Sequence, residues 1–158
     1  MIIRLLAAGT KSPGWINAGF GEYAKRLPRE CRLELVEIPL VKRSKASSIG
    51  QIRQREGEKI LSRIPNTSHV VALDIGGSNW STEDLASKMN GWLQSAMPVD
   101  LLIGGPDGLS AECKRRAEQK WSLSQLTLPH LLVRVIVAEQ IYRAWSIVSG
   151  HPYHRGAT

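Results

Sequence analysis

Short apolar runs alternate with helix-like segments along the whole chain, and this alternation restricts the fold more than any other feature of the sequence. Strands that are separated by helices run parallel in one sheet, and the helices cover its faces. The apolar runs predict five strands, near residues 1–8, 32–38, 69–75, 99–103 and 121–126. The intervening patterns predict five helices, near residues 15–27, 48–64, 81–95, 109–119 and 130–148. We therefore expect an α/β fold with a mostly parallel sheet and helices on both faces.

The composition is that of an ordinary globular protein. Of the 158 residues, 42% are hydrophobic and 22% are charged, which fits one domain over residues 1–158. The opening apolar run is too short for a membrane span or a signal-peptide core, and Arg4 interrupts it. Cys31 and Cys113 lie far apart without a CxxC motif, which favours two reduced thiols over a disulfide or a zinc site. We expect a cytoplasmic protein with no membrane partner and no metal.

The positive charge lies entirely in the first part of the chain. The net charge is +7, and residues 1–63 contain 13 Lys and Arg against 6 Glu, whereas the remainder contains 8 basic and 8 acidic residues. A basic half favours a polyanionic partner, and nucleic acid is the commonest large one in cells. A solvated surface that only keeps the protein in solution explains the same charge. Segment 39–48, with Lys42, Arg43 and Lys45 and no acid, is expected to form a mobile basic loop.

The last predicted helix has apolar side chains on nearly every face, interrupted mainly by Arg134, Glu139, Gln140 and Arg143. A helix of this kind has to be buried on all sides. A second subunit covers a terminal helix more easily than the core of so small a domain does, so a homodimer is the leading inference. A central helix within the monomer is the alternative.

Three predicted strands end in segments that could line one pocket, within residues 70–77, 100–110 and 121–130. Glycines there let the backbone approach a ligand closely, and ligands bind at the carboxyl ends of strands in open α/β sheets. Neither GxxxxGK[ST] nor a GxGxxG after the first strand is present, which argues against ATP hydrolysis and ordinary dinucleotide chemistry. We interpret Asp74 as a turn or cap carboxylate in preference to a catalytic group.

Four separated motifs closely resemble the RlmH family of small SPOUT-class methyltransferases: LLIGGPDGLS, SLSQLTLPH, VRVIVAEQIYRAWSI and the closing HPYHR. The resemblance covers essentially the whole chain, including AAGTK and GEYAKRLP near the N-terminus. It implies methylation of N3 of a pseudouridine in 23S ribosomal RNA, within the ribosome, by S-adenosylmethionine. It also implies a homodimer with the active site at its interface, and a C-terminal trefoil knot, which general topology rules exclude. Knot and cofactor pocket would fall roughly within residues 70–158.

The family's cofactor contacts can be carried over by motif. They fall on Leu73, Gly104, Leu123, Ser124, Gln125, Leu126, Thr127 and Leu128. These positions belong to the same three strand ends that the residue pattern selects. Since the chain shows no separate RNA-binding domain, we expect the core itself to bind RNA, with Lys42, Arg43, Lys45 and Arg155 as candidate contacts.

The implied chemistry needs a proton acceptor. N3 of pseudouridine is an imide nitrogen that carries a proton at neutral pH, and this proton has to leave before the nitrogen can attack a methyl group. The candidate catalytic residues are His154, Tyr153 and Arg143, because a neutral histidine can accept the proton and an arginine favours the developing anion. An ion pair between Arg143 and Glu139 is an equal alternative.

The remaining expectations concern the tail and two other histidines. The tail, residues 151–155, follows a helix expected at the dimer interface, so we expect it to act on the cofactor of the partner subunit. His130 is expected to cap or pack at a helix start and His69 to lie at a strand edge, and neither is assigned a role.

Two alternative functions stay open. One is a non-catalytic RNA-binding or ribosome-assembly factor on the same fold, and the other is a small-molecule enzyme that uses another nucleotide.

Overall fold

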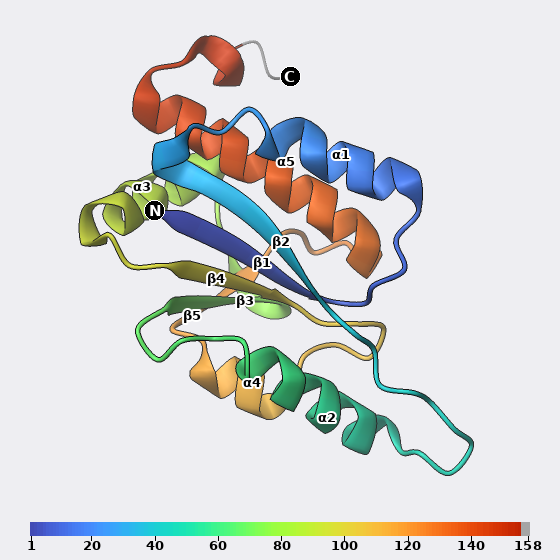
Figure 1. The fold of residues 1–158 in the computed structure, drawn as a ribbon. Coiled ribbons are helices and arrows are strands. Elements are labelled where there is room, and N and C mark those ends of the chain that lie inside the picture. The colour runs from blue at the N-terminus through green and yellow to red at the C-terminus, as the bar shows by residue number, and fades with distance from the viewer. Residues whose placement is uncertain (156–158) are drawn as a thin grey trace.

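The computed structural model describes residues 1–155 and contains one five-stranded, all-parallel sheet with the strand order β2-β1-β4-β3-β5 (Figure 1). The strands are β1 (Ile2–Ala8), β2 (Arg32–Ile38), β3 (His69–Asn79), β4 (Val99–Ile103) and β5 (Gln119–Ser122). The helices are α1 (Gly14–Ala24), α2 (Ile49–Leu61), α3 (Thr82–Ser95), α4 (Ala111–Arg116) and α5 (His130–Ser149). Two short 3₁₀ helices, η1 (Arg29–Cys31) and η2 (Pro152–His154), complete the described elements. The predicted α/β class is confirmed.

The sheet separates two layers of helices. Helices α1, α5 and α3 cover one face, with α5 in the middle, and α2 and α4 cover the other face (Figure 1). All five residues of β4 are buried, because this central strand is covered on both faces. Its side chains alternate accordingly: Leu101 packs in the core beneath α5, and Leu102 packs in the core beneath α2 and α4. The carboxyl ends of β1, β3 and β4 therefore meet at one edge of a rigid scaffold.

The fifth strand ends earlier than the sequence pattern predicts, because serine side chains bend the chain. β5 stops at Ser122, whereas the apolar pattern predicts a strand up to residue 126. The Ser122 hydroxyl donates to the carbonyl of Ser124 at 3.1 Å, and the Leu126 N–H donates to the Ser124 hydroxyl at 2.9 Å. These side-chain bonds replace ladder hydrogen bonds and leave residues 123–129 as a loop.

The cysteines, the lengths of the helices and the possible metal ligands bear on the functional class of the protein. Burial raises the pKa of the Cys31 thiol to about 11 and also raises that of Cys113, so these free thiols stay protonated and unreactive. Within residues 1–155, no helix is long and apolar enough to cross a lipid bilayer. The same part of the chain holds no group of three or more His, Cys, Asp and Glu side chains arranged to bind a metal ion. The trefoil knot stays a prediction.

Candidate cofactor pocket

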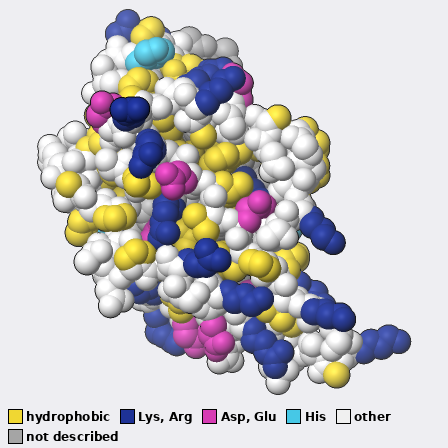
Figure 2. Space-filling model, in the orientation of Figure 1, with side chains coloured by type: hydrophobic (Ala, Val, Ile, Leu, Met, Phe, Trp, Pro, Cys, Tyr) yellow, Lys and Arg dark blue, Asp and Glu magenta, His cyan; other side chains and the backbone are white. Residues whose placement is uncertain are grey.

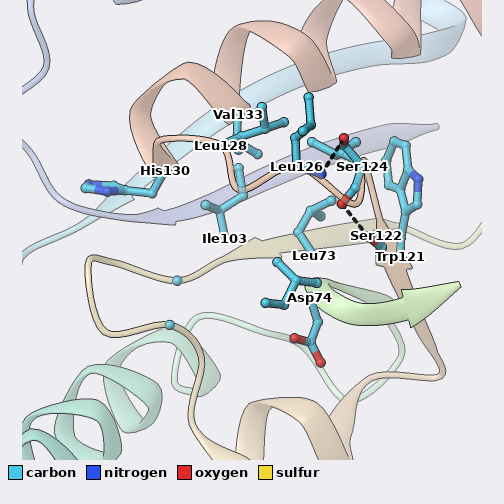
Figure 3. A pocket seen from close by; sticks show the side chains of 14 residues that line it. Leu73, Asp74, Ile103, Trp121, Ser122, Ser124, Leu126, Leu128, His130 and Val133 are labelled. Atoms are coloured by element: carbon cyan, nitrogen blue, oxygen red, sulfur yellow. Dashed lines mark hydrogen bonds between the residues drawn. The ribbon is translucent and has the colours of Figure 1, made fainter. Parts of the chain in front are cut away.

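A pocket opens at the carboxyl ends of β3 and β4 and is closed on its other side by the loop 123–129 and the start of α5 (Figure 3). Six predicted cofactor residues line it: Leu73, Gly104, Leu123, Ser124, Leu126 and Leu128. The other two, Gln125 and Thr127, lie in the same loop but are exposed and do not line the pocket. The structure thus brings the three predicted strand ends together.

The walls of the pocket are apolar with a polar edge. They are mainly apolar, from leucines and from Ile103 and Val133, and Trp121 is buried behind them. The polar groups at the edge include the hydroxyls of Ser122 and Ser124 and the Asp74 carboxylate. An apolar slot with a few polar groups at its edge is the usual form of a nucleoside site. A carboxylate at the edge suits a ligand that also carries a positive sulfonium.

The glycine turn, residues 104–108, forms one wall of the pocket. Its chain reversal is closed by the Gly108 N–H, which donates to the Gly105 carbonyl at 3.0 Å, and Gly108 adopts a left-handed φ of 81°. Gly104 has no room for a side chain, because a Cβ there would lie 2.4 Å from the carbonyl carbon of Gly108. Both glycines are therefore required by the backbone of the turn itself.

Two arginines from the basic half fasten the glycine turn. Arg43 donates to Asp107 Oδ2 at 2.6 Å, and Arg53 Nε donates to the Asp107 carbonyl at 2.8 Å. The hydrogen bond to Asp107 raises the pKa of the Arg43 guanidinium, and the buried carboxylate of Glu56, 3.4 Å away, raises it further. Arg43, predicted only as an RNA contact, thus also connects the basic loop to the pocket. Sequence alone gave no signal for this pairing, because Asp107 lies 64 residues away.

We expect Arg43→Ala to weaken binding of S-adenosylhomocysteine by up to about fivefold, because the wall of the pocket loses one of its two anchors. The magnitude follows from about 0.2–1 kcal/mol for a partly exposed ion pair. Isothermal titration calorimetry measures it, and Asp107→Asn should give a similar loss. Lys45→Ala, on the same loop, is the matched control and should bind normally. Equal affinities for Arg43→Ala and Lys45→Ala would show that the turn does not depend on this anchor.

The predicted catalytic residues gather at the opposite end of α5. Gly150, with a left-handed φ of 74°, ends the helix and turns the chain back on it. Tyr153 Oη donates to Glu139 Oε1 at 3.1 Å, and Arg143 Nε donates to the same oxygen at 2.8 Å. His154 Nδ1 lies 3.2 Å from Ser146 Oγ. The tail therefore forms an ordered cluster on the helix, and the alternative ion pair of Arg143 is present.

The electrostatics of this cluster limit the roles of its members. Burial and the neighbouring Glu139 carboxylate raise the pKa of Tyr153 to about 12, so the phenol stays protonated and can donate but not accept a proton. The same carboxylate raises the pKa of Arg143, which stays cationic. The cluster is centred on Glu139, which lies nine residues, or about 14 Å, along α5 from His130. No residue of the cluster lines the pocket of its own chain.

His130, which received no role from the sequence, lines the pocket. It is the first residue of α5 and lies at the end of the pocket opposite Trp121, where its ring points away from Ile103 and Leu128 (Figure 3). Burial, Arg134 and Arg43 together lower the pKa of its imidazole, which therefore stays neutral at pH 7. The sequence contained one indication that His130 would line the pocket, which is its position directly after the predicted cofactor loop.

Comparison with known proteins agrees with this geometry. The family model described as "Predicted SPOUT methyltransferase" matches residues 1–154. A curated relative, "Ribosomal RNA large subunit methyltransferase H" of Hahella chejuensis (strain KCTC 2396), is 53% identical over 155 residues, which are 98% of this chain and 99% of the relative.

Solved structures share the fold. A protein of Bordetella pertussis Tohama I described as a probable methyltransferase superposes with a TM-score of 0.57 at 15% identity, over 90% of this chain and 95% of that one. A probable methylase family protein of Haemophilus influenzae Rd KW20 gives a TM-score of 0.55 at 13% identity, over 99% and 71%. These likenesses show the architecture alone, whereas the family model and the close relative confirm the resemblance seen in the motifs. The chain belongs to the SPOUT methyltransferase family.

Proposed function

We propose that the protein transfers a methyl group from S-adenosylmethionine to N3 of a pseudouridine in 23S ribosomal RNA, within the ribosome and in the cytoplasm. The observation that carries this proposal is the 53% identity, over nearly the full length of both chains, with a protein named for methylation of large-subunit ribosomal RNA. The pocket supports it, because six of the predicted cofactor residues line one apolar slot. When bound, S-adenosylmethionine supplies an electrophilic methyl group on a sulfonium.

The residues of this chain position and shield the reaction. Leu73, Leu123 and Leu128 would hold the adenosine and keep water out, and the Asp74 carboxylate would favour the positive charge of the donor. The glycine turn would contribute backbone groups at close range. Positioning of donor and acceptor in line is the main contribution that such a site can make.

A homodimer would complete the site. Helix α5 buries one side against the sheet, but Leu131, Leu132, Val135 and Ile136 on its first turns remain only half-buried. On neighbouring α1, Trp15 is 64% exposed. Antiparallel pairing of this apolar surface with a second copy would cover it and would bring the tail of each subunit towards the pocket of the other. Tyr153, His154, Arg143 and Arg155 would then contact the RNA base at the partner's pocket.

The decisive test of the proposed function is mass spectrometry of 23S ribosomal RNA from a strain that lacks this protein. We expect one pseudouridine to lose one methyl group, and we expect the purified protein to restore it on ribosomes from that strain. A non-catalytic assembly factor predicts full methylation in the deletion strain and no heat of binding with S-adenosylmethionine.

The RNA-binding surface would be the basic face, formed by Lys42, Arg43, Lys45, Arg53, Arg55 and Lys59. Figure 2 shows Lys and Arg side chains gathered around α2 and the loop that precedes it. Because Arg43 and Arg53 also hold the glycine turn, this face borders the pocket. RNA bound there would lie beside the methyl donor.

We expect Lys42→Ala and Lys45→Ala together to reduce the dependence of ribosome binding on salt. Each lost phosphate contact should lower the slope of log K against log salt by roughly one. Affinity for S-adenosylhomocysteine should not change, since both side chains are exposed and do not line the pocket. Filter binding at several salt concentrations measures the slope, and Lys25→Ala, directly after α1, is the control that removes a positive charge elsewhere on the surface. An unchanged slope would mean that the loop is only a solvated surface.

A further inference from the structure

Both buried and exposed residues line the pocket. Trp121 is 3% exposed, whereas Ile75 and Leu126 are 78% and 74% exposed. His130, at the end opposite Trp121, is half-buried (Figure 3). Arg43 is close enough to His130 to lower its pKa, so the basic face adjoins this same end. A large acceptor such as RNA that is bound on the basic face would approach a bound donor from the side of His130.

Two titratable side chains line the described pocket, Asp74 and His130. A carboxylate is a weak base for an imide, because an unperturbed aspartate has a pKa of about 3.9. Asp74 also faces a cation, with Lys114 Nζ at 3.7 Å from its carboxylate. A general base works best when its pKa lies near the operating pH, which favours an imidazole over a carboxylate.

The ring of His130 is available for proton transfer. Neither of its nitrogens is hydrogen-bonded to any residue in 1–155, whereas His69 and His154 bond to Gln119 and Ser146. The charged groups that face it are Arg134 on its own helix and Arg43 on the basic loop. Both arginines are paired, Arg134 with Glu37 at 2.9 Å and Arg43 with Asp107. A neutral, unpartnered imidazole therefore lies at the mouth of the pocket, next to fixed positive charge.

We propose that His130, in the subunit that binds the cofactor, is the general base that removes the N3 proton of the target pseudouridine. The proposal rests on the proposed function. A ring nitrogen of His130 takes the proton, and the N3 lone pair attacks the methyl carbon. The N–C bond forms as the C–S bond breaks, and the bonding pair stays on sulfur to give S-adenosylhomocysteine. The imidazolium then releases its proton to water.

The assignment separates the two histidines that could serve as base. His130 belongs to the subunit that holds the methyl donor, so its distance from the reacting atoms is fixed by one chain. His154 would come from the partner, and its Nδ1 is already engaged with Ser146. In this assignment, His154 contacts the RNA, and Arg43 and Arg134 favour the anion that forms after proton removal.

The test compares pH–rate profiles of single-turnover methylation on ribosomes at saturating S-adenosylmethionine. Wild type should lose activity below the pKa of His130, which lies below the usual 6.5 or so. His130→Asn should be about a hundredfold slower at pH 7 and should recover as rising pH ionises N3 without a base. A residue with only a structural role would not show this recovery. His130→Gln should give the same rate and pH–rate profile as His130→Asn. His154→Asn should still lose activity at low pH, as wild type does.

A second readout needs no reaction. In proton NMR of the ligand-free protein, the histidine signal that is lost in His130→Asn should titrate with a pKa below the usual histidine value. His69→Gln, on the far end of β3, is the matched control and should keep wild-type rates. The inference is overturned if wild type methylates ribosomes and His130→Asn keeps the same rate and profile. If wild type itself does not methylate, the proposed function fails instead.

Discussion

Gly104→Ala is expected to remove most of the affinity for S-adenosylhomocysteine while the sheet stays folded. The added Cβ would lie 2.4 Å from the Gly108 carbonyl carbon and 2.7 Å from the Leu109 nitrogen. These are backbone atoms that cannot rotate away, so the glycine turn must open. Overpacking of this kind costs about 1–3 kcal/mol, which corresponds to about a ten- to hundredfold loss of affinity. Calorimetry measures the affinity, and thermal unfolding monitors the fold.

The matched control is Gly91→Ala, in the middle of α3. A Cβ at Gly91 meets no atom within 4 Å, and alanine is the better helix former, so this variant should bind normally and unfold at the same or a higher temperature. Wild-type affinity in a folded Gly104→Ala protein would show that the turn is not a wall of the cofactor site.

The order and type of every long element could be predicted, because the signals for them are local. The capping box that Ser81 and Asp84 suggest forms at the start of α3, with both reciprocal hydrogen bonds present. The strand predicted at 121–126 is present as β5 but ends at Ser122, for an equally physical reason. Leu123 and Leu126 continue an apolar pattern, but the Ser124 hydroxyl takes the hydrogen bond that a strand would need. A side chain that competes for a backbone hydrogen bond leaves no periodic pattern in the sequence, so apolar periodicity could not predict where the strand ends.

The pocket was predicted in outline, because glycine-rich and polar strand ends converge in any parallel sheet. Contacts between distant segments could not be predicted. Arg43 bonds to Asp107, which is 64 residues away in the sequence. The buried Arg134 of α5 donates to the carbonyl of Gly9, which is 125 residues away. These arginines determine the charge around His130, so the property that makes His130 a candidate base depends on the fold and not on its neighbours in sequence.

Truncation after Gly150 is expected to reduce methylation of ribosomes by about a hundredfold or more, since a positioned donor or cation is worth that much in a transition state. Affinity for S-adenosylhomocysteine should not change, because no residue of the tail, 151–155, lines the pocket of its own chain. The ring centroids of Tyr153 and Tyr142 lie 4.5 Å apart, so truncation also removes a packing contact at the end of α5. The double variant His154→Ala with Arg155→Ala keeps that contact and should still lose most activity. Wild-type activity in both proteins would show that the tail has no catalytic part.

Mixed dimers decide which pocket the tail serves. One subunit is truncated after Gly150, and the other carries Gly104→Ala with an intact tail, so each homodimer lacks one component and should be nearly inactive. If the tail acts across the interface, the mixed dimer contains one complete site and regains up to half of the wild-type activity per dimer. If the tail acted within its own chain, no complete site would form. We expect recovery, because the tail does not line the pocket of its own chain and antiparallel pairing would bring it to the pocket of the partner. A mixed dimer as inactive as its parents would contradict both the antiparallel pairing and the shared active site.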